Sequence, residues 1–208
     1  MRVVSDGRKP VTLLVGLESE AFDYGGWSWG ASTTIGIKTS SRWNLTVGPN
    51  VSRLYAPAQF VTSVTDPSYN QTFGRRYVFA PLHQTSVSLE TRFNATFTPR
   101  LSLETYVQPL LSSQDYGAAR QFVAPQTFDF VPYSGQVPNL DFNLRSLRGN
   151  AVLRWEWSQG STLYVAWQQL RSDMAPYGDF DFGRDRGALF RTRPDNIVVI
   201  KVNRWFNP

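Results

Sequence analysis

Few side chains in this sequence could perform acid–base or nucleophilic chemistry. His83 is the only histidine, and Ser86 follows it in the stretch APLHQTS. A serine hydrolase needs a histidine base that faces its serine within hydrogen-bonding reach. Two residues at this spacing along one strand do not face each other in that way. The sequence therefore predicts no catalytic residue, and a hydrolase would need a serine or a carboxylate from another strand to face His83.

Three aspartates in the stretch GDFDFGRD are the only candidates for a metal site: Asp179, Asp181 and Asp185. Carboxylate oxygens are ligands that Ca²⁺ prefers, but the EF-hand spacing and its terminal glutamate are absent. The following residues, RDRGALFR, are typical of a short helix near residues 183–191, and aspartates before a helix cap its first N–H groups. Helix capping is the favoured interpretation, a Ca²⁺ site is the weaker alternative, and no cofactor is expected.

Alternation of polar and apolar residues indicates the strands that would position the remaining side chains. In TSVSLETRFNATFTPRLSLETYV (residues 85–107), Val87, Leu89 and Phe93 share one parity while polar residues occupy the other. A period of two places the two sets on opposite faces of a strand. The pattern resumes after Thr98-Pro99-Arg100, which predicts a hairpin that places Phe97 opposite Leu101 and Asn94 opposite Glu104.

A second hairpin is predicted across Ser158-Gln159-Gly160. It would pair Trp155 with Leu163, Leu153 with Val165, Arg154 with Tyr164, and Glu156 with Thr162. The charged residues of the polar parity either line an aqueous interior or decorate a solvent-exposed sheet, and they are Glu90, Arg92, Glu104, Arg154 and Glu156.

The strand candidates are joined by connections of unequal length. About eight strands are expected, near residues 10–21, 27–38, 43–55, 86–97, 101–112, 150–157, 162–173 and 195–206. Short turns are expected at 39–42, 98–100 and 158–160, and long connections at 56–85, 113–149 and 174–194. Residues 76–83 could extend the fourth strand through a bulge near Gln84. Short turns on one side and long loops on the other are typical of an outer-membrane barrel.

Strand length and tryptophan positions favour the same class. A strand of about 12 residues tilted by about 45° rises roughly 28 Å, close to the thickness of the hydrocarbon layer. Tryptophans near strand ends suit a membrane–water interface, and here they are Trp27, Trp29, Trp43, Trp155, Trp157 and Trp205. The alternative is that these rings fill the core of a soluble β-sandwich.

Composition restricts the remaining classes. The chain has 208 residues, of which 41% are hydrophobic, so it is too apolar to be disordered. It contains no cysteine, which excludes disulfides and thiolate metal sites. Its net charge of +5 comes from arginines scattered among acids, so nucleic acid is not an expected partner. The N-terminus carries no signal-peptide pattern. Because an exported protein needs one, the chain is expected to be either cytosolic or the C-terminal piece of a longer protein.

Several long strings resemble one protein family. DFNLRSLRGNAVLRWEWSQGSTLYVAWQQLRSD (141–173) and GDFDFGRDRGALFRTRPDNIVVIKVNRWF (178–206) resemble the C-terminal end of uncharacterised bacterial proteins called domain of unknown function 5916. SDGRKPV, GGWSWG, GPNVSRLYAPAQFVTSVTDP and the stretch from FGRRYVF to ETYVQP follow the same order. The family members resemble outer-membrane proteins with a signal peptide, a module similar to carbohydrate-binding family 9, and a large β-barrel.

This resemblance and the patterns together define the expectation. The fold class is all-β: an antiparallel up-and-down meander, residues 1–208 being one partial domain at the C-terminal end of a transmembrane β-barrel. The resemblance implies a bacterial outer-membrane location, with membrane lipid, the barrel-assembly machinery and glycans, bound through the absent N-terminal module, as partners. Surface anchoring or carbohydrate uptake is the expected function, without catalytic activity in this chain. A TonB-dependent receptor, a porin-like transporter and an outer-membrane hydrolase are the alternatives.

Overall fold

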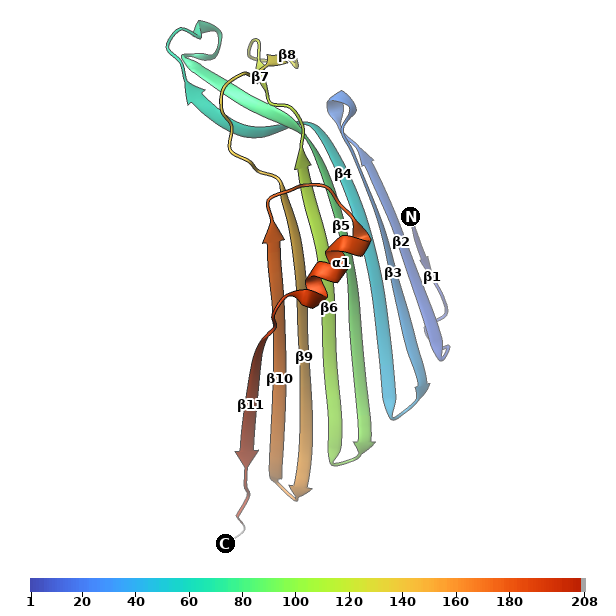
Figure 1. The fold of residues 1–208 in the computed structure, drawn as a ribbon. Coiled ribbons are helices and arrows are strands. Elements are labelled where there is room, and N and C mark those ends of the chain that lie inside the picture. Colours follow the sequence, from blue (N-terminus) through green and yellow to red (C-terminus); the bar gives the residue numbers. More distant parts are fainter. Residues whose placement is uncertain (207–208) are drawn as a thin grey trace.

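The chain forms one open antiparallel β-sheet with a single α-helix on one face (Figure 1). The computed structural model describes residues 1–206. The sheet order is β1-β2-β3-β4-β5-β6-β9-β10-β11, and the short strands β7 and β8 extend β5 beyond this path. The strands of the path are β1 (Arg2–Val4), β2 (Val11–Ala21), β3 (Trp27–Ser40), β4 (Trp43–Thr65), β5 (Arg75–Thr98), β6 (Leu101–Tyr116), β9 (Phe142–Ser158), β10 (Ser161–Ala175) and β11 (Asp195–Asn203).

The remaining elements lie in the connections. They are η1 (Asp23–Gly25), η2 (Asn70–Thr72), β7 (Arg120–Phe122), β8 (Phe130–Pro132) and α1 (Phe182–Arg191). The helix predicted near residues 183–191 is thus confirmed, starting one residue earlier. The antiparallel meander is confirmed as well, since neighbours along the path are antiparallel and follow one another in the sequence, except that β7 and β8 lie between β6 and β9.

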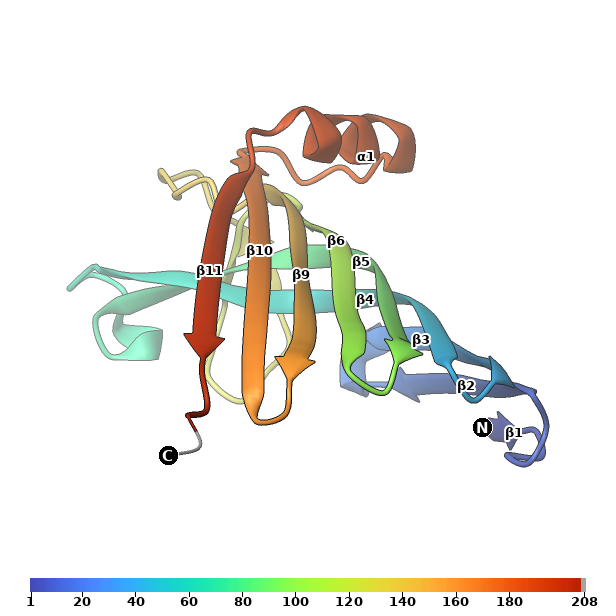
Figure 2. The ribbon, with the colours of Figure 1, turned by 90° about the horizontal axis from the view of Figure 1, so that it is seen from below.

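The sheet does not close on itself. Its edge strands β1 and β11 lie at opposite ends in both views (Figures 1 and 2), and within residues 1–206 they do not pair. Closure of a barrel requires the first and last strands to exchange hydrogen bonds. The architecture of the described residues is therefore an open sheet.

Strands β4, β5 and β9 are about twice as long as predicted, and β9 starts at Phe142, inside the long connection expected at 113–149. The expected long connection at 56–85 is wrong, because β4 continues to Thr65 and β5 starts at Arg75. The predicted bulge near Gln84 is also wrong, since β5 keeps its register with β6 from Leu82 to Ser88. The irregularities lie in β4 instead, between Ala56 and Gln59 and between Phe60 and Thr62. Pro57 lies in the first of them, and proline cannot donate the hydrogen bond that a regular ladder needs.

The two hairpins have nearly the predicted registers. Across β9 and β10, Trp155 faces Leu163 and Glu156 faces Thr162, as predicted. Asn94 faces Glu104 across β5 and β6, also as predicted. The pairing of Phe97 with Leu101 is wrong, because a register shift between Thr96 and Thr98 places Thr98 opposite Leu101.

Directly opposed residues on neighbouring strands point to the same face, so the register defines the two faces of the sheet. One row of opposed residues crosses eight strands and is apolar except for Thr105: Val11, Ile37, Leu45, Phe93, Thr105, Ala151, Trp167 and Val198. The next row points to the other face and is polar or glycine except for Ile197: Thr12, Gly36, Thr46, Arg92, Tyr106, Asn150, Gln168 and Ile197. The sheet thus has an apolar face and a polar face.

Helix α1 lies against one face of the sheet (Figure 2), and its buried contacts with Leu111 and Leu147 identify this as the apolar face. It packs against β6, β9 and β10. Leu189 of the helix, Leu111 of β6 and Leu147 of β9 form a buried cluster against which Phe180 packs. The rest of the apolar face carries large exposed side chains: Leu17 is 50% exposed, Trp155 46% and Ile200 64%.

Candidate functional site

The polar face contains a recess between β5, β6 and β9 with a volume of about 440 Å³. Its charged and aromatic groups are Arg92, Glu104 and Tyr106, and the amides of Asn94 and Asn150 complete its polar lining. The guanidinium of Arg92 lies 4.8 Å from the centre of the Tyr106 ring, a cation–π contact between directly opposed residues. The recess therefore offers donors and acceptors suited to a polar solute.

The other charged residues predicted for this face also make side-chain contacts, across strands for Glu90 and Arg154 and within β9 for Glu156. Gln108 Nε2 donates to Glu90 Oε1 at 3.1 Å. Arg154 Nε donates to the Tyr164 hydroxyl at 3.3 Å, and its Nη2 donates to Glu156 Oε2 at 3.3 Å. These contacts make two separate groups, since Arg154 and Glu156 lie near the short-turn end of β9 while Glu90 lies in the middle of β5.

Sequence reasoning did not single out Tyr106 or Asn150 as members of the recess. Tyr106 has the polar parity of its strand, but its contact with Arg92 depends on the register across β5 and β6. Asn150 stands opposite Tyr106 because β6 pairs with β9, two strands separated by a long connection. Alternation around a short turn does not predict the pairing of β6 with β9.

The predicted interfacial tryptophans lie near the ends of the sheet. Trp27 and Trp29 begin β3 at the loop end, and Trp43 begins β4 at the short-turn end. Trp155 and Trp157 lie near the end of β9 with their ring centroids 6.4 Å apart. Trp205 follows β11 and lies against the β9–β10 turn, where its backbone N–H donates to Ser161 Oγ at 3.0 Å.

Gly160 explains how Trp205 reaches that turn. The glycine has a φ of +71°, and a Cβ at this position would lie 2.9 Å from Cβ of Trp205. A larger residue would be strained and would displace the indole. The turn glycine thus leaves room for the last tryptophan of the chain.

The three aspartates considered as Ca²⁺ ligands are engaged with protein groups. Asp181 caps α1, because its Oδ1 accepts from the backbone N–H of Arg184 at 2.7 Å. Asp179 Oδ2 accepts from Arg184 Nη1 at 2.6 Å. Asp185 accepts from Arg184 Nε at 2.8 Å and from Asn143 Nδ2 at 2.8 Å. No cluster of three or more metal-binding side chains occurs in the part of the chain that the structure describes.

Asp185 belongs to a buried polar network that joins α1 to the sheet. Its side chain is 0% exposed, and that of Arg145 on β9 is 5% exposed. Burial alone would raise the pKa of Asp185, but hydrogen bonds from Arg184, Asn143 and the N–H of Asp181 outweigh it and hold the pKa below its ordinary value. Arg145 also donates to Asn143 Oδ1 at 2.9 Å and to Asp173 Oδ2 at 2.7 Å. Asn143 and Arg145 were not predicted, because their partner lies far along the sequence.

His83 and Ser86 lie on opposite faces of β5. The imidazole of His83 stacks on Tyr55 with ring centroids 4.7 Å apart. The Ser86 hydroxyl is 2.8 Å from the Ser112 hydroxyl. Across residues 1–206, no hydrogen bond joins His83 to a serine or a carboxylate. His83 and Ser86 therefore do not form a serine–histidine pair.

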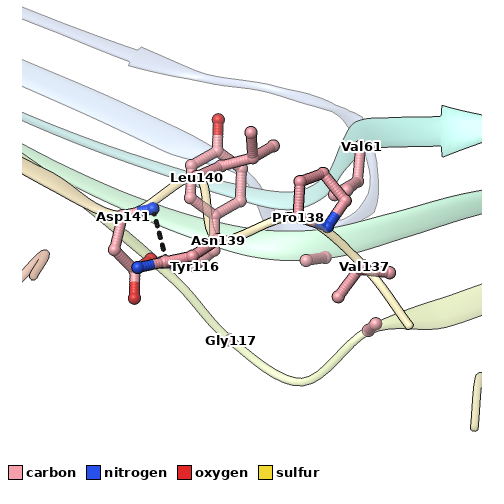
Figure 3. A pocket seen from close by; sticks show the side chains of 10 residues that line it. Val61, Tyr116, Gly117, Val137, Pro138, Asn139, Leu140 and Asp141 are labelled. Atoms are coloured by element: carbon pink, nitrogen blue, oxygen red, sulfur yellow. Dashed lines mark hydrogen bonds between the residues drawn. The ribbon is translucent and has the colours of Figure 1, made fainter. Parts of the chain in front are cut away.

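The loop end of the sheet carries a small pocket of about 180 Å³ (Figure 3). Val61, Ala80 and Val137 give it apolar walls. Its polar groups are already paired: Asp141 Oδ1 accepts from the Tyr116 N–H at 2.8 Å, and Asn139 Oδ1 accepts from the Asp141 N–H at 3.0 Å. These bonds fix the connection between β6 and β9, so the pocket has a structural role.

An aromatic cluster stabilises the same end. Phe79 of β5 packs edge-on against Phe122 and Phe130, with ring centroids 4.6 and 5.6 Å away. Phe128 continues the cluster and stacks on Tyr24 with ring centroids 3.9 Å apart. The cluster therefore connects the β2–β3 loop to the β6–β9 connection.

Comparison with known proteins gives no relative: no family model, no curated protein and no solved structure matches the chain. Membership of the family named above therefore stays a prediction. Within residues 1–206, no helix is long and apolar enough to cross a membrane.

Proposed function

We propose that the sheet is the membrane-embedded wall of an outer-membrane β-barrel region, with its apolar face against lipid and its polar face toward water. In this function the chain anchors, or forms a pore for, a carbohydrate-binding module of a longer protein. The observation that carries the proposal is the separation of the two adjacent rows that cross eight strands, one apolar and the next polar. A sheet with one face in lipid needs this alternation along every strand.

The exposure of the apolar face supports the proposal. A soluble sandwich would cover such a face with a second sheet about 10 Å away. Within the described residues only α1 lies on it, and Val198, Ile200 and Val202 remain 61%, 64% and 62% exposed. Lipid is the medium that stabilises a large uncovered apolar surface.

The dimensions agree with a bilayer. Strand β3 has 14 residues, with Trp27 and Trp29 at its loop end, and its last residue, Ser40, pairs with Trp43. A strand of that length tilted by about 45° rises roughly 33 Å, close to the roughly 30 Å of a hydrocarbon core. Tryptophans at both levels suit the two membrane–water interfaces.

A porin-like or TonB-dependent transporter is the second candidate, and the polar recess around Arg92 favours it. The recess presents a guanidinium, a carboxylate and two amides on the face that would be lumenal. Such groups suit hydroxyl-rich solutes such as glycans. We do not propose a hydrolase, since His83 and Ser86 point to opposite faces.

The proposal is tested with nitroxide labels on two single cysteines, which the cysteine-free chain permits. Phe93→Cys reports on the apolar face and Asn94→Cys, its neighbour, on the polar face. In bilayers, the label at position 93 should be accessible to oxygen and protected from a water-soluble quencher, and the label at 94 should show the reverse. Protection of position 93 from both reagents would mean a packed protein core and would favour the soluble sandwich.

A further inference from the structure

A groove of about 230 Å³ runs between helix α1 and the apolar face of the sheet. Its floor consists of Val87 and Leu89 from β5 and Pro109 and Leu111 from β6, and α1 contributes Phe182 and Phe190 to its wall. Both phenylalanines are more than half exposed, at 52% and 58%. The groove is therefore apolar, open to its surroundings and built by two elements that the buried Leu189 holds together.

A single charged side chain, Arg186, lines this groove. The two arginines in the first half of α1 differ in their partners. Arg184 binds Asp179 and Asp185, which raise the pKa of its guanidinium. Arg186 contacts the Phe182 ring, 5.7 Å from its centre, and no acidic side chain of residues 1–206 forms an ion pair with it. An exposed cation thus stands beside an apolar groove without an anionic partner.

We propose that this groove binds one anionic phospholipid, with an acyl chain against Val87, Leu89 and Leu111 and the phosphate at Arg186. The inference rests on the proposed function, because it places α1 at the interface of the bilayer that contacts the apolar face. It goes further by assigning a specific lipid site and the class of headgroup that the site selects.

The chemistry of the groove selects this occupant. Ser88 also lines the groove, but strand alternation points its side chain to the other face of the sheet. The other lining side chains are apolar except for the cation of Arg186, so the complementary ligand has an apolar chain attached to an anionic group. Phe182, Arg186 and Phe190 are spaced at four residues, so they form one exposed stripe along the helix. Asp185 and Leu189, in contrast, are buried against the sheet. Helices that lie in a membrane interface combine aromatic residues with arginines in this way.

The test uses native mass spectrometry of the whole chain in detergent, titrated with equimolar phosphatidylglycerol and phosphatidylcholine of identical acyl chains. The wild-type chain should retain phosphatidylglycerol about fivefold more than phosphatidylcholine, as expected for one arginine near an anionic headgroup. Arg186→Gln should bring the ratio close to one. Leu89→Trp, which fills the groove, should reduce the retention of both lipids.

Arg193→Gln is the matched control, because Arg193 is an exposed arginine just beyond α1 that does not line the groove. It should leave the ratio unchanged, and an equal loss in both variants would overturn the proposal by showing a general charge effect. A ratio near one in the wild-type chain would overturn it as well. The proposed function can fail independently of the lipid site. A label at position 93 that is shielded from oxygen would reject the membrane-embedded sheet. Equal retention of phosphatidylglycerol and phosphatidylcholine, together with an oxygen-accessible label at position 93, would reject only the lipid site in the groove.

Discussion

Arg145 of β9 and Asp185 of α1 form an ion pair beneath the helix, with Arg145 Nε 3.7 Å from Asp185 Oδ1. Neither side chain reaches solvent to any extent, since their exposed fractions are 5% and 0%. A buried charge needs partners, and here Asn143 binds both members of the pair. The pair therefore determines where the only α-helix of the described residues sits on the sheet.

Removal of the Asp185 carboxylate should detach α1. Asp185→Ala removes the buried carboxylate that Arg145 and Arg184 share and leaves Arg145 with only the half-exposed Asp173 as an acidic partner, which costs about 3–5 kcal/mol of the free energy of unfolding. Urea unfolding followed by circular dichroism measures this loss. Asp173→Ala is the control, because Asp173 also binds Arg145 but its side chain is 42% exposed, so we expect about 1 kcal/mol or less. Equal losses in the two variants would contradict the role of burial.

The same pair predicts a pH dependence of helix docking. The pKa of Asp185 is lower in the folded chain than in the unfolded chain, where an aspartate has a pKa of about 3.9. The stabilisation is therefore complete above about pH 4 and is lost as the pH falls through the lower, folded-state pKa.

A nitroxide on Arg191→Cys, an exposed helix position, measures this release as a gain in label mobility on acidification. In an Asp185→Asn background the carboxyl group is absent, so the mobility should show no such step. A step of the same size in that background would assign the transition to another group.

Phe79→Ala should loosen the loop end of the sheet. The substitution removes the ring that contacts Phe60, Phe122 and Phe130, and we expect a loss of about 2 kcal/mol in the local stability of β7 and β8. Hydrogen exchange of residues 120–132 should become faster. Phe73→Ala is the control, because Phe73 is 91% exposed and its truncation should leave exchange unchanged.

Much of the fold could be predicted because it is local. The pairings of Trp155 with Leu163 and of Asn94 with Glu104 follow from alternation around a short turn, which needs only neighbouring residues. The error at Phe97 shows the limit of this reasoning. A single irregular residue beside the turn moves the register, and alternation alone does not locate it.

The contacts of α1 could not be predicted in the same way. The sequence indicated the helix and its aspartates, but Asn143 and Arg145 lie in the stretch expected to be a long connection, 113–149, whereas the structure places them at the start of β9. Their role arises only when the connection after β10 returns α1 across β9. From the sequence, Asp185 was therefore a weak candidate for a Ca²⁺ ligand. In the structure its carboxylate accepts hydrogen bonds from Arg184 and Asn143.

The strand order also sets the sequence of events by which the sheet can form. Turns of two residues join β3 to β4, β5 to β6 and β9 to β10, so each of these hairpins closes at a small cost in chain entropy. Pairing of β6 with β9 must instead close the long segment from Tyr116 to Phe142, which makes it a late step. Helix α1 packs on both of these strands. The helix thus bridges the β6–β9 pairing, which forms last. Its release would first separate β9, β10 and β11 from the remaining strands.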